Sequence, residues 1–116
     1  MGSLVRPLTR VLGVVLVLVG ILGFFMSSPL LGIFEVDTIH NIIHLASGAI
    51  ALIVGGNQGM SRMFLIIFGL VYAAVALIGY VQGATVLGIF AVNAADNALH
   101  AVIGAVCLVV GFGSKS

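Results

Sequence analysis

Charged side chains are scarce in this 116-residue chain, where Asp, Glu, Lys and Arg together make up 6%. About a quarter of the residues in an ordinary soluble domain are charged, and disordered chains and nucleic-acid binders also depend on dense charge. The composition therefore excludes these three classes. Tryptophan is absent, and the single cysteine, Cys107, allows neither an intramolecular disulfide nor a thiolate metal site. Hydrophobic residues make up 62% of the chain, which is typical of a protein embedded in a membrane.

Four long stretches without any charged residue predict four transmembrane helices. They cover residues 11–34, 38–61, 63–95 and 97–114, and each approaches or exceeds the roughly 18 to 20 residues that cross a bilayer. Turn residues set the ends, so we expect helices near residues 8–28, 37–55, 61–82 and 93–112. Lipid offers no partners to backbone groups, which requires each span to be helical. The expected fold is an all-α, four-helix membrane bundle forming a single domain over residues 1–116.

The two halves of the chain match each other, which indicates an internal duplication. A shift of 56 positions makes about 17 of 56 aligned residues identical without a gap. The matches include segment 31–34 with 87–90, Asn41 with Asn97, and His44 with His100. We therefore expect one repeat at about residues 1–56 and a second at about 57–112. Each repeat holds two spans, so both would enter the membrane in the same direction, around a pseudo-twofold axis along the membrane normal.

The few charged residues predict the orientation in the membrane. The basic residues, which are Arg6, Arg10, Arg62 and Lys115, fall on the side of both termini, whereas Glu35 and Asp37 fall on the other side. The positive-inside rule then predicts cytoplasmic termini in a multi-pass protein of the cytoplasmic membrane. Little of the chain lies outside the bilayer. We therefore expect a partner membrane protein or a second copy to bind it through intramembrane contacts, and we expect no nucleic-acid partner.

A polar motif, Asn-x-x-His-x-x-x-Gly, occurs once in each repeat. Its residues share one helix face, because positions spaced three, four and seven apart align along a helix. The first copy comprises Asn41, His44 and Gly48, and the second comprises Asn97, His100 and Gly104. Residues Asp37 and Asn93 stand where the N-caps of these two helices belong. His40 occupies the position that Asp96 has in the second repeat.

This paired motif resembles a bacterial family of small four-helix membrane proteins classed as a domain of unknown function. The resemblance covers nearly the whole chain, and the segment from Asp96 to His100 is its most family-like part. The first repeat departs from it at His40. The resemblance implies a fold and a membrane location, and it implies no established activity.

Three hypotheses for the polar residues remain open. In the first, a non-enzymatic bundle is organised by Asn41, Asn97, Asp96 and the histidines, and it binds a partner or a small ligand without any cofactor. In the second, His44 and His100 ligate a haem b or another pigment, with Gly48 and Gly104 leaving room for the macrocycle. In the third, a transition metal is bound by four residues: His40, His44, His100 and Asp96. Hydrolytic motifs are absent from the sequence, so we expect no catalysis beyond a redox role.

Overall fold

The described residues, 2–26 and 37–114 of a computed structural model, form four α-helices and a short β-hairpin. The elements in chain order are a 3₁₀ turn (Gly2–Leu4), α1 (Val5–Phe25), α2 (Thr38–Val54), α3 (Gln58–Gln82), β1 (Thr85–Val86), β2 (Phe90–Ala91) and α4 (Ala94–Gly113). The prediction of an all-helical bundle is confirmed. Helix α1 begins and ends three residues earlier than the expected range of 8–28, and Met26 after it is extended.

Three helical segments are long and apolar enough to cross a membrane, namely Gly2–Phe25, Gln58–Gln82 and Ala94–Gly113. Helix α2 is also apolar but has only 17 residues, so at about 1.5 Å per residue it is roughly 4 Å shorter than a hydrocarbon core of about 30 Å. Large hydrophobic side chains are exposed on all four helices, among them Phe25, Ile53, Val81 and Phe112. Such a surface suits contact with lipid, and these features are those of a helical membrane protein.

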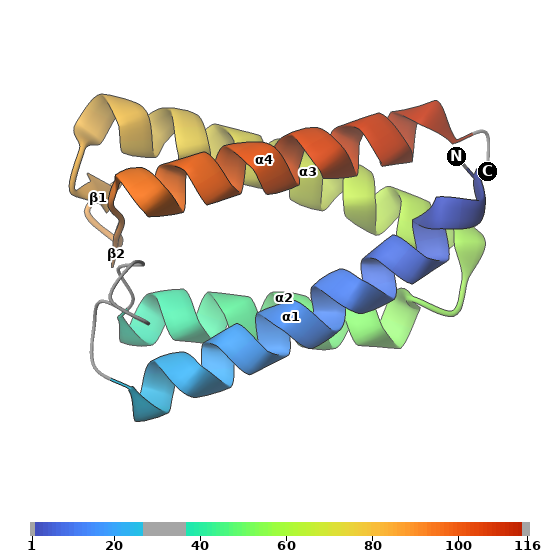
Figure 1. The fold of residues 1–116 in the computed structure, drawn as a ribbon, viewed down its shortest axis with the longest axis horizontal. Helices are drawn as coiled ribbons and strands as arrows, with labels where there is room; N and C mark the ends of the chain where they lie inside the picture. Colours follow the sequence, from blue (N-terminus) through green and yellow to red (C-terminus); the bar gives the residue numbers. More distant parts are fainter. Residues whose placement is uncertain (1, 27–36, 115–116) are drawn as a thin grey trace.

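The helices are arranged as two hairpins, α1 with α2 and α3 with α4 (Figure 1). Both chain ends lie at one end of the bundle, where the short connection between α2 and α3 also lies. The opposite end carries the β-hairpin and the N-termini of α2 and α4. The polar motif begins at these two N-termini, so the topology brings both of its copies to the same end of the bundle.

Glycines allow the two helices of each hairpin to approach closely. A β-carbon on Gly48 of α2 would lie 2.8 Å from the backbone nitrogen of Val17 and 2.9 Å from the carbonyl oxygen of Gly13. In the second hairpin, a β-carbon on Gly104 would lie 3.1 Å from the carbonyl oxygen of Gly69. Small residues at such crossings let helix backbones pack directly, which is how helices associate in lipid.

The main hydrophobic core joins α1, α3 and α4. Its buried members are Val5, Leu12, Leu16, Leu65, Phe68, Tyr72, Cys107 and Val110. None of the described residues of α2 belongs to this core. An open apolar groove of about 420 Å³ runs between α2 and α3 and is lined by Ser47, Phe68 and Tyr72 among others. Helix α2 is therefore held mainly by α1, its partner in the hairpin.

A β-hairpin between α3 and α4 covers the end of the bundle that holds the polar motif. Its strands pair Thr85 with Ala91 and Val86 with Phe90, and the turn places both Leu87 and Gly88 at positive φ, 55° and 70°. Val86 and Val92 are buried against apolar side chains of α2 and α3, including Ile43. The β-hairpin therefore connects the α1–α2 pair with the α3–α4 pair next to the polar motif.

Candidate functional site at the N-termini of α2 and α4

Side-chain caps fix where α2 and α4 begin, and this sets the register of every polar residue that follows. The backbone N–H of His40 donates to the Asp37 carboxylate at 2.8 Å. The backbone N–H of Asp96 donates to the side chain of Asn93, and the N–H of Asn93 donates to the Asp96 carboxylate, both at 2.9 Å. This reciprocal pair is a capping box. Asp37 and Asn93 are thus the N-caps of the two helices.

The two motif asparagines each lie against a glycine of their own hairpin. Asn41 packs on Gly23, and Asn97 packs on Gly79, so closely that a β-carbon on either glycine would collide with the carboxamide oxygen. Both asparagines are buried, and neither carboxamide oxygen accepts a hydrogen bond from any described residue. Each asparagine therefore fills a glycine notch within its hairpin. A hydrogen bond between the two halves is not found for them among the described residues.

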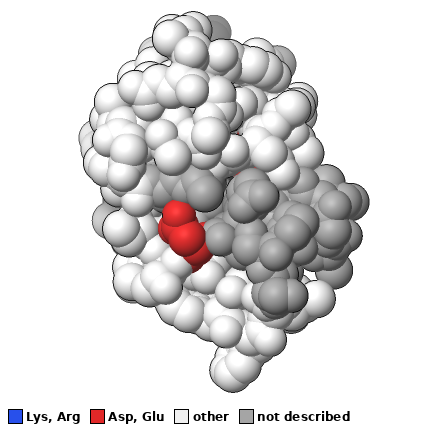
Figure 2. Space-filling view, turned by 90° about the vertical axis from the view of Figure 1, so that its left-hand side faces the viewer, with Lys and Arg blue, Asp and Glu red and all other residues white. Residues whose placement is uncertain are grey.

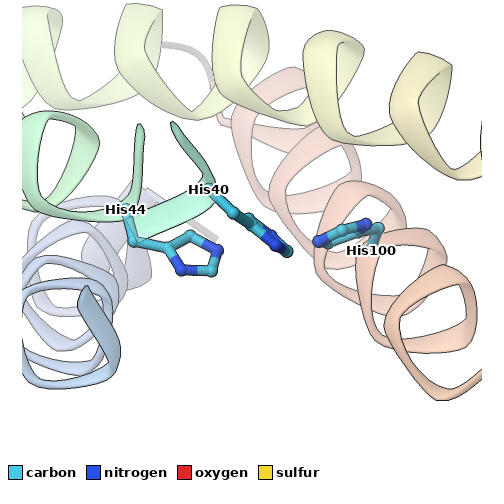
Figure 3. Close-up of side chains that lie close together, drawn as sticks. All are labelled: His40, His44 and His100. Atoms are coloured by element: carbon cyan, nitrogen blue, oxygen red, sulfur yellow. The ribbon is translucent and has the colours of Figure 1, made fainter. Parts of the chain in front are cut away.

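All three histidines of the sequence meet in one buried cluster (Figure 3). His40 and His44 lie one turn apart on α2, with ring centroids 4.4 Å apart, and His40 is 5.8 Å from the ring of His100 on α4. Their side chains are only 2%, 8% and 4% exposed in chain order. One ring nitrogen from each histidine lies within 4.8 Å of those of the other two. The fold thus assembles three imidazoles from both hairpins.

Asp96, which the sequence groups with the histidines as a ligand, has a different place. It is buried, and its carboxylate accepts the Asn93 N–H in the first turn of α4. Among the described residues, the set of closely spaced metal-binding side chains comprises the three histidines without Asp96. The third residue of a helix suits a carboxylate, because it satisfies free N–H groups and favours the positive end of the helix dipole.

Tyr72 of α3 also contacts the histidine cluster, which the sequence did not reveal. Its ring packs edge-on against His100 with centroids 5.0 Å apart, and it continues into Phe68 at 4.1 Å. The shift of 56 residues pairs Tyr72 with Leu16, so the repeat gives no polar signal at this position. The available sequence signal was a tyrosine hydroxyl within the apolar central stretch of α3.

Neighbouring helices lie directly against the two motif glycines, which the haem hypothesis assigns as space for the macrocycle. The positions above Gly48 and Gly104 are filled by backbone atoms of Val17 and Ala73, respectively. In addition, the ring centroid of His40 lies 4.4 Å from that of His44 and 5.8 Å from that of His100. The His40 ring lies between the rings of His44 and His100 (Figure 3).

The charges are separated between the two ends of the bundle. Figure 2 shows the end with the β-hairpin, where acidic atoms are visible and no Lys or Arg of the described residues appears. At the opposite end, the Arg62 side chain donates from Nε to the carbonyl oxygens of Gly111 and Ser114, at 2.9 and 3.0 Å. Glu35, Lys115 and the segment 31–34 fall outside the described residues.

Comparison with known proteins places the chain in a family. A family model described as "Domain of unknown function (DUF4383)" matches residues 6–113. The chain belongs to this family. No curated protein matches the chain. No solved structure matches it either. The DUF4383 match spans all four helices and both copies of the polar motif, and it brings no activity with it.

Proposed function

We propose that this protein is a non-enzymatic membrane bundle that binds one transition-metal ion through His40, His44 and His100. The observation that carries the proposal is the convergence of three buried imidazoles, each offering a nitrogen within 4.8 Å of the others. Imidazole is the commonest metal ligand in proteins and suits zinc, copper, iron and nickel. Nitrogens about 2.0 to 2.1 Å from one ion are roughly 3.4 Å apart, so the rings need to close by a little over 1 Å.

The hydrogen bonding of the cluster supports a ligand in preference to a purely structural role. The Nδ1 atoms of His44 and His100 are buried and have no hydrogen-bond partner among the described residues. Leaving a buried polar atom unsatisfied costs about 1 to 3 kcal/mol. If the histidines only held the helices together, these unsatisfied nitrogens would lower the stability of the bundle. A bound ion would satisfy the ring nitrogens of His44 and His100 that no described residue pairs with.

The position of His40 supports the same conclusion. The halves of the chain match at His44 and His100, and they differ one turn earlier, where His40 replaces the aspartate of the second half. That aspartate caps its helix, whereas His40 contacts the other two rings. Among the positions where the two repeats carry different polar residues, the one occupied by His40 is therefore the one that would complete the ligand set.

We further propose the two-repeat architecture and the orientation that the sequence predicts. Equivalent contacts recur in both hairpins at positions 56 apart: Gly13 with Gly48 and Gly69 with Gly104, and Gly23 with Asn41 and Gly79 with Asn97. These recurrences favour a parallel duplication with a pseudo-twofold axis along the membrane normal. The separation of charge favours cytoplasmic termini in a bacterial cytoplasmic membrane, with the histidine cluster near the outer face.

Metal analysis of the purified protein tests the proposed function. We expect about one transition-metal ion per chain after purification in detergent and incubation with excess metal. His44→Ala and His100→Ala should each reduce bound metal to background, whereas Ser47→Ala, one turn further along α2, should bind as the wild type does. Background metal in the wild type would refute the proposal. Oxidised and reduced absorption spectra of the same sample test the haem hypothesis, which requires a Soret band that both histidine variants lose.

A further inference from the structure

We infer that the ion held by this cluster is monovalent copper, Cu⁺; this inference rests on the proposed function and adds the identity of the ion. The first observation is the charge of the ligand set. His40, His44 and His100 are neutral ligands when they bind metal, and no carboxylate or thiolate of the described residues joins their group. The Asp96 carboxylate accepts the N–H of Asn93 instead. Cys107 lies seven residues beyond His100, about 10 Å further along α4.

Because the cluster is buried, its neutral ligands favour an ion of low charge. The three side chains are at most 8% exposed, and the surrounding helices present apolar surfaces to lipid. The cost of moving an ion from water to a medium of low dielectric constant rises with the square of its charge. For ions of equal size, a divalent cation is therefore penalised about four times as much as a monovalent one. Neutral ligands cannot offset the second charge, because none of them carries a negative charge.

Ligand type selects copper among monovalent cations. Sodium and potassium ions are hard cations that prefer oxygen ligands, whereas the three imidazole rings have only nitrogen donors. Imidazole nitrogens are suitable ligands for copper, and the cluster provides three of them. Zn²⁺ usually adds a water molecule to three protein ligands to complete a tetrahedron. The Tyr72 ring packs edge-on against His100, which leaves less room for such a water beside that ligand.

Parallel titrations under anaerobic conditions test the inference. The full-length protein in lipid nanodiscs is titrated with Cu⁺ against the chromophoric chelator bicinchoninate, and with Zn²⁺ against a zinc indicator dye. We expect one Cu⁺ per chain, bound at least about 100-fold more tightly than Zn²⁺. Cys107→Ala should leave both affinities unchanged. His40→Glu places a carboxylate in the set, so it should shift the preference towards Zn²⁺ by at least about tenfold.

A measurement on the wild type alone guards against variants that fail to fold. X-ray absorption of the Cu⁺-loaded protein should show three nitrogen neighbours at about 2.0 Å and no sulfur at about 2.3 Å. A sulfur neighbour would overturn the inference, because the ion would then lie at Cys107 or a methionine. Tighter binding of Zn²⁺ than of Cu⁺ would also overturn it and would leave the proposed function standing. Failure to bind either ion would overturn the inference, and the proposed function would also be refuted if the metal analysis of the wild type then found only background metal.

Discussion

Replacing Gly48 with alanine should separate α1 from α2, because the added methyl group has no space. Its β-carbon would lie 2.7 Å from Cγ2 of Val17, 2.8 Å from the Val17 nitrogen and 2.9 Å from the Gly13 oxygen. A side chain can rotate away, but the two backbone atoms cannot. Restoring ordinary contact at about 3.4 Å requires the helices to move apart by about 0.6 Å along the whole crossing.

The size of the effect follows from two opposing terms. Overpacking of a tight contact costs about 1 to 3 kcal/mol, and the upper half of this range applies because the obstacles are backbone atoms. Alanine favours the helix over glycine by about 1 kcal/mol. We therefore expect Gly48→Ala to lower the free energy of unfolding by about 1 to 2 kcal/mol. Gly104→Ala meets the backbone nitrogen of Ala73 at 2.9 Å and should behave alike.

Unfolding in sodium dodecyl sulfate, followed by circular dichroism, measures this loss. Cys107 provides a second probe, because it is the only cysteine and is fully buried, so a thiol-reactive dye reports its exposure. Gly59→Ala is the matched control. The nearest atom that its β-carbon would meet among the described residues is an oxygen at 3.6 Å, so the substitution should be neutral or stabilising. If Gly48→Ala is as stable as Gly59→Ala, the inferred close helix packing is wrong.

Three further predictions concern the helix ends and the ion. Asn93→Ala removes the capping box of α4 and should cost about 1 kcal/mol in the same titration, whereas Asn93→Asp should retain most of the stability. Arg62→Met removes two hydrogen bonds to the end of α4, so amide exchange in the last turn of that helix should become several times faster, with no change expected in α1. Chelating the ion should lower the stability of the wild type by about 2.7 kcal/mol when the free metal had been at 100 times its dissociation constant. His44→Ala should show no such dependence on the chelator.

Local sequence signals predicted the helices well, because the caps act within one turn. The beginnings of α2 and α4 follow Asp37 and Asn93 directly, each within one residue of the expected start. The β-hairpin was not predicted. Its strands have two residues each, too short for an alternating pattern, and Leu87 at positive φ is a rare conformation for leucine.

The candidate site was only partly predictable. Helical spacing brought His40 and His44 together on α2, since residues four apart share a face. Whether His100 would join them depended on how one hairpin docks on the other, which no local pattern encodes. The place of Asp96 has a local cause instead. Its spacing from His100 suggested a shared ligand, but its place in the first turn gives it a cap to form, which competes for the carboxylate.

The division into two hairpins has a consequence for how the protein is made. The closest helix packing lies within each hairpin, so each can form as its two spans leave the insertion machinery. His40 and His44 belong to the first hairpin and His100 to the second. The three-histidine cluster therefore does not exist until the second hairpin has been inserted and has docked. A bound ion would join the earlier-made hairpin to the later-made one, and its presence would mark a molecule in which the two hairpins have docked.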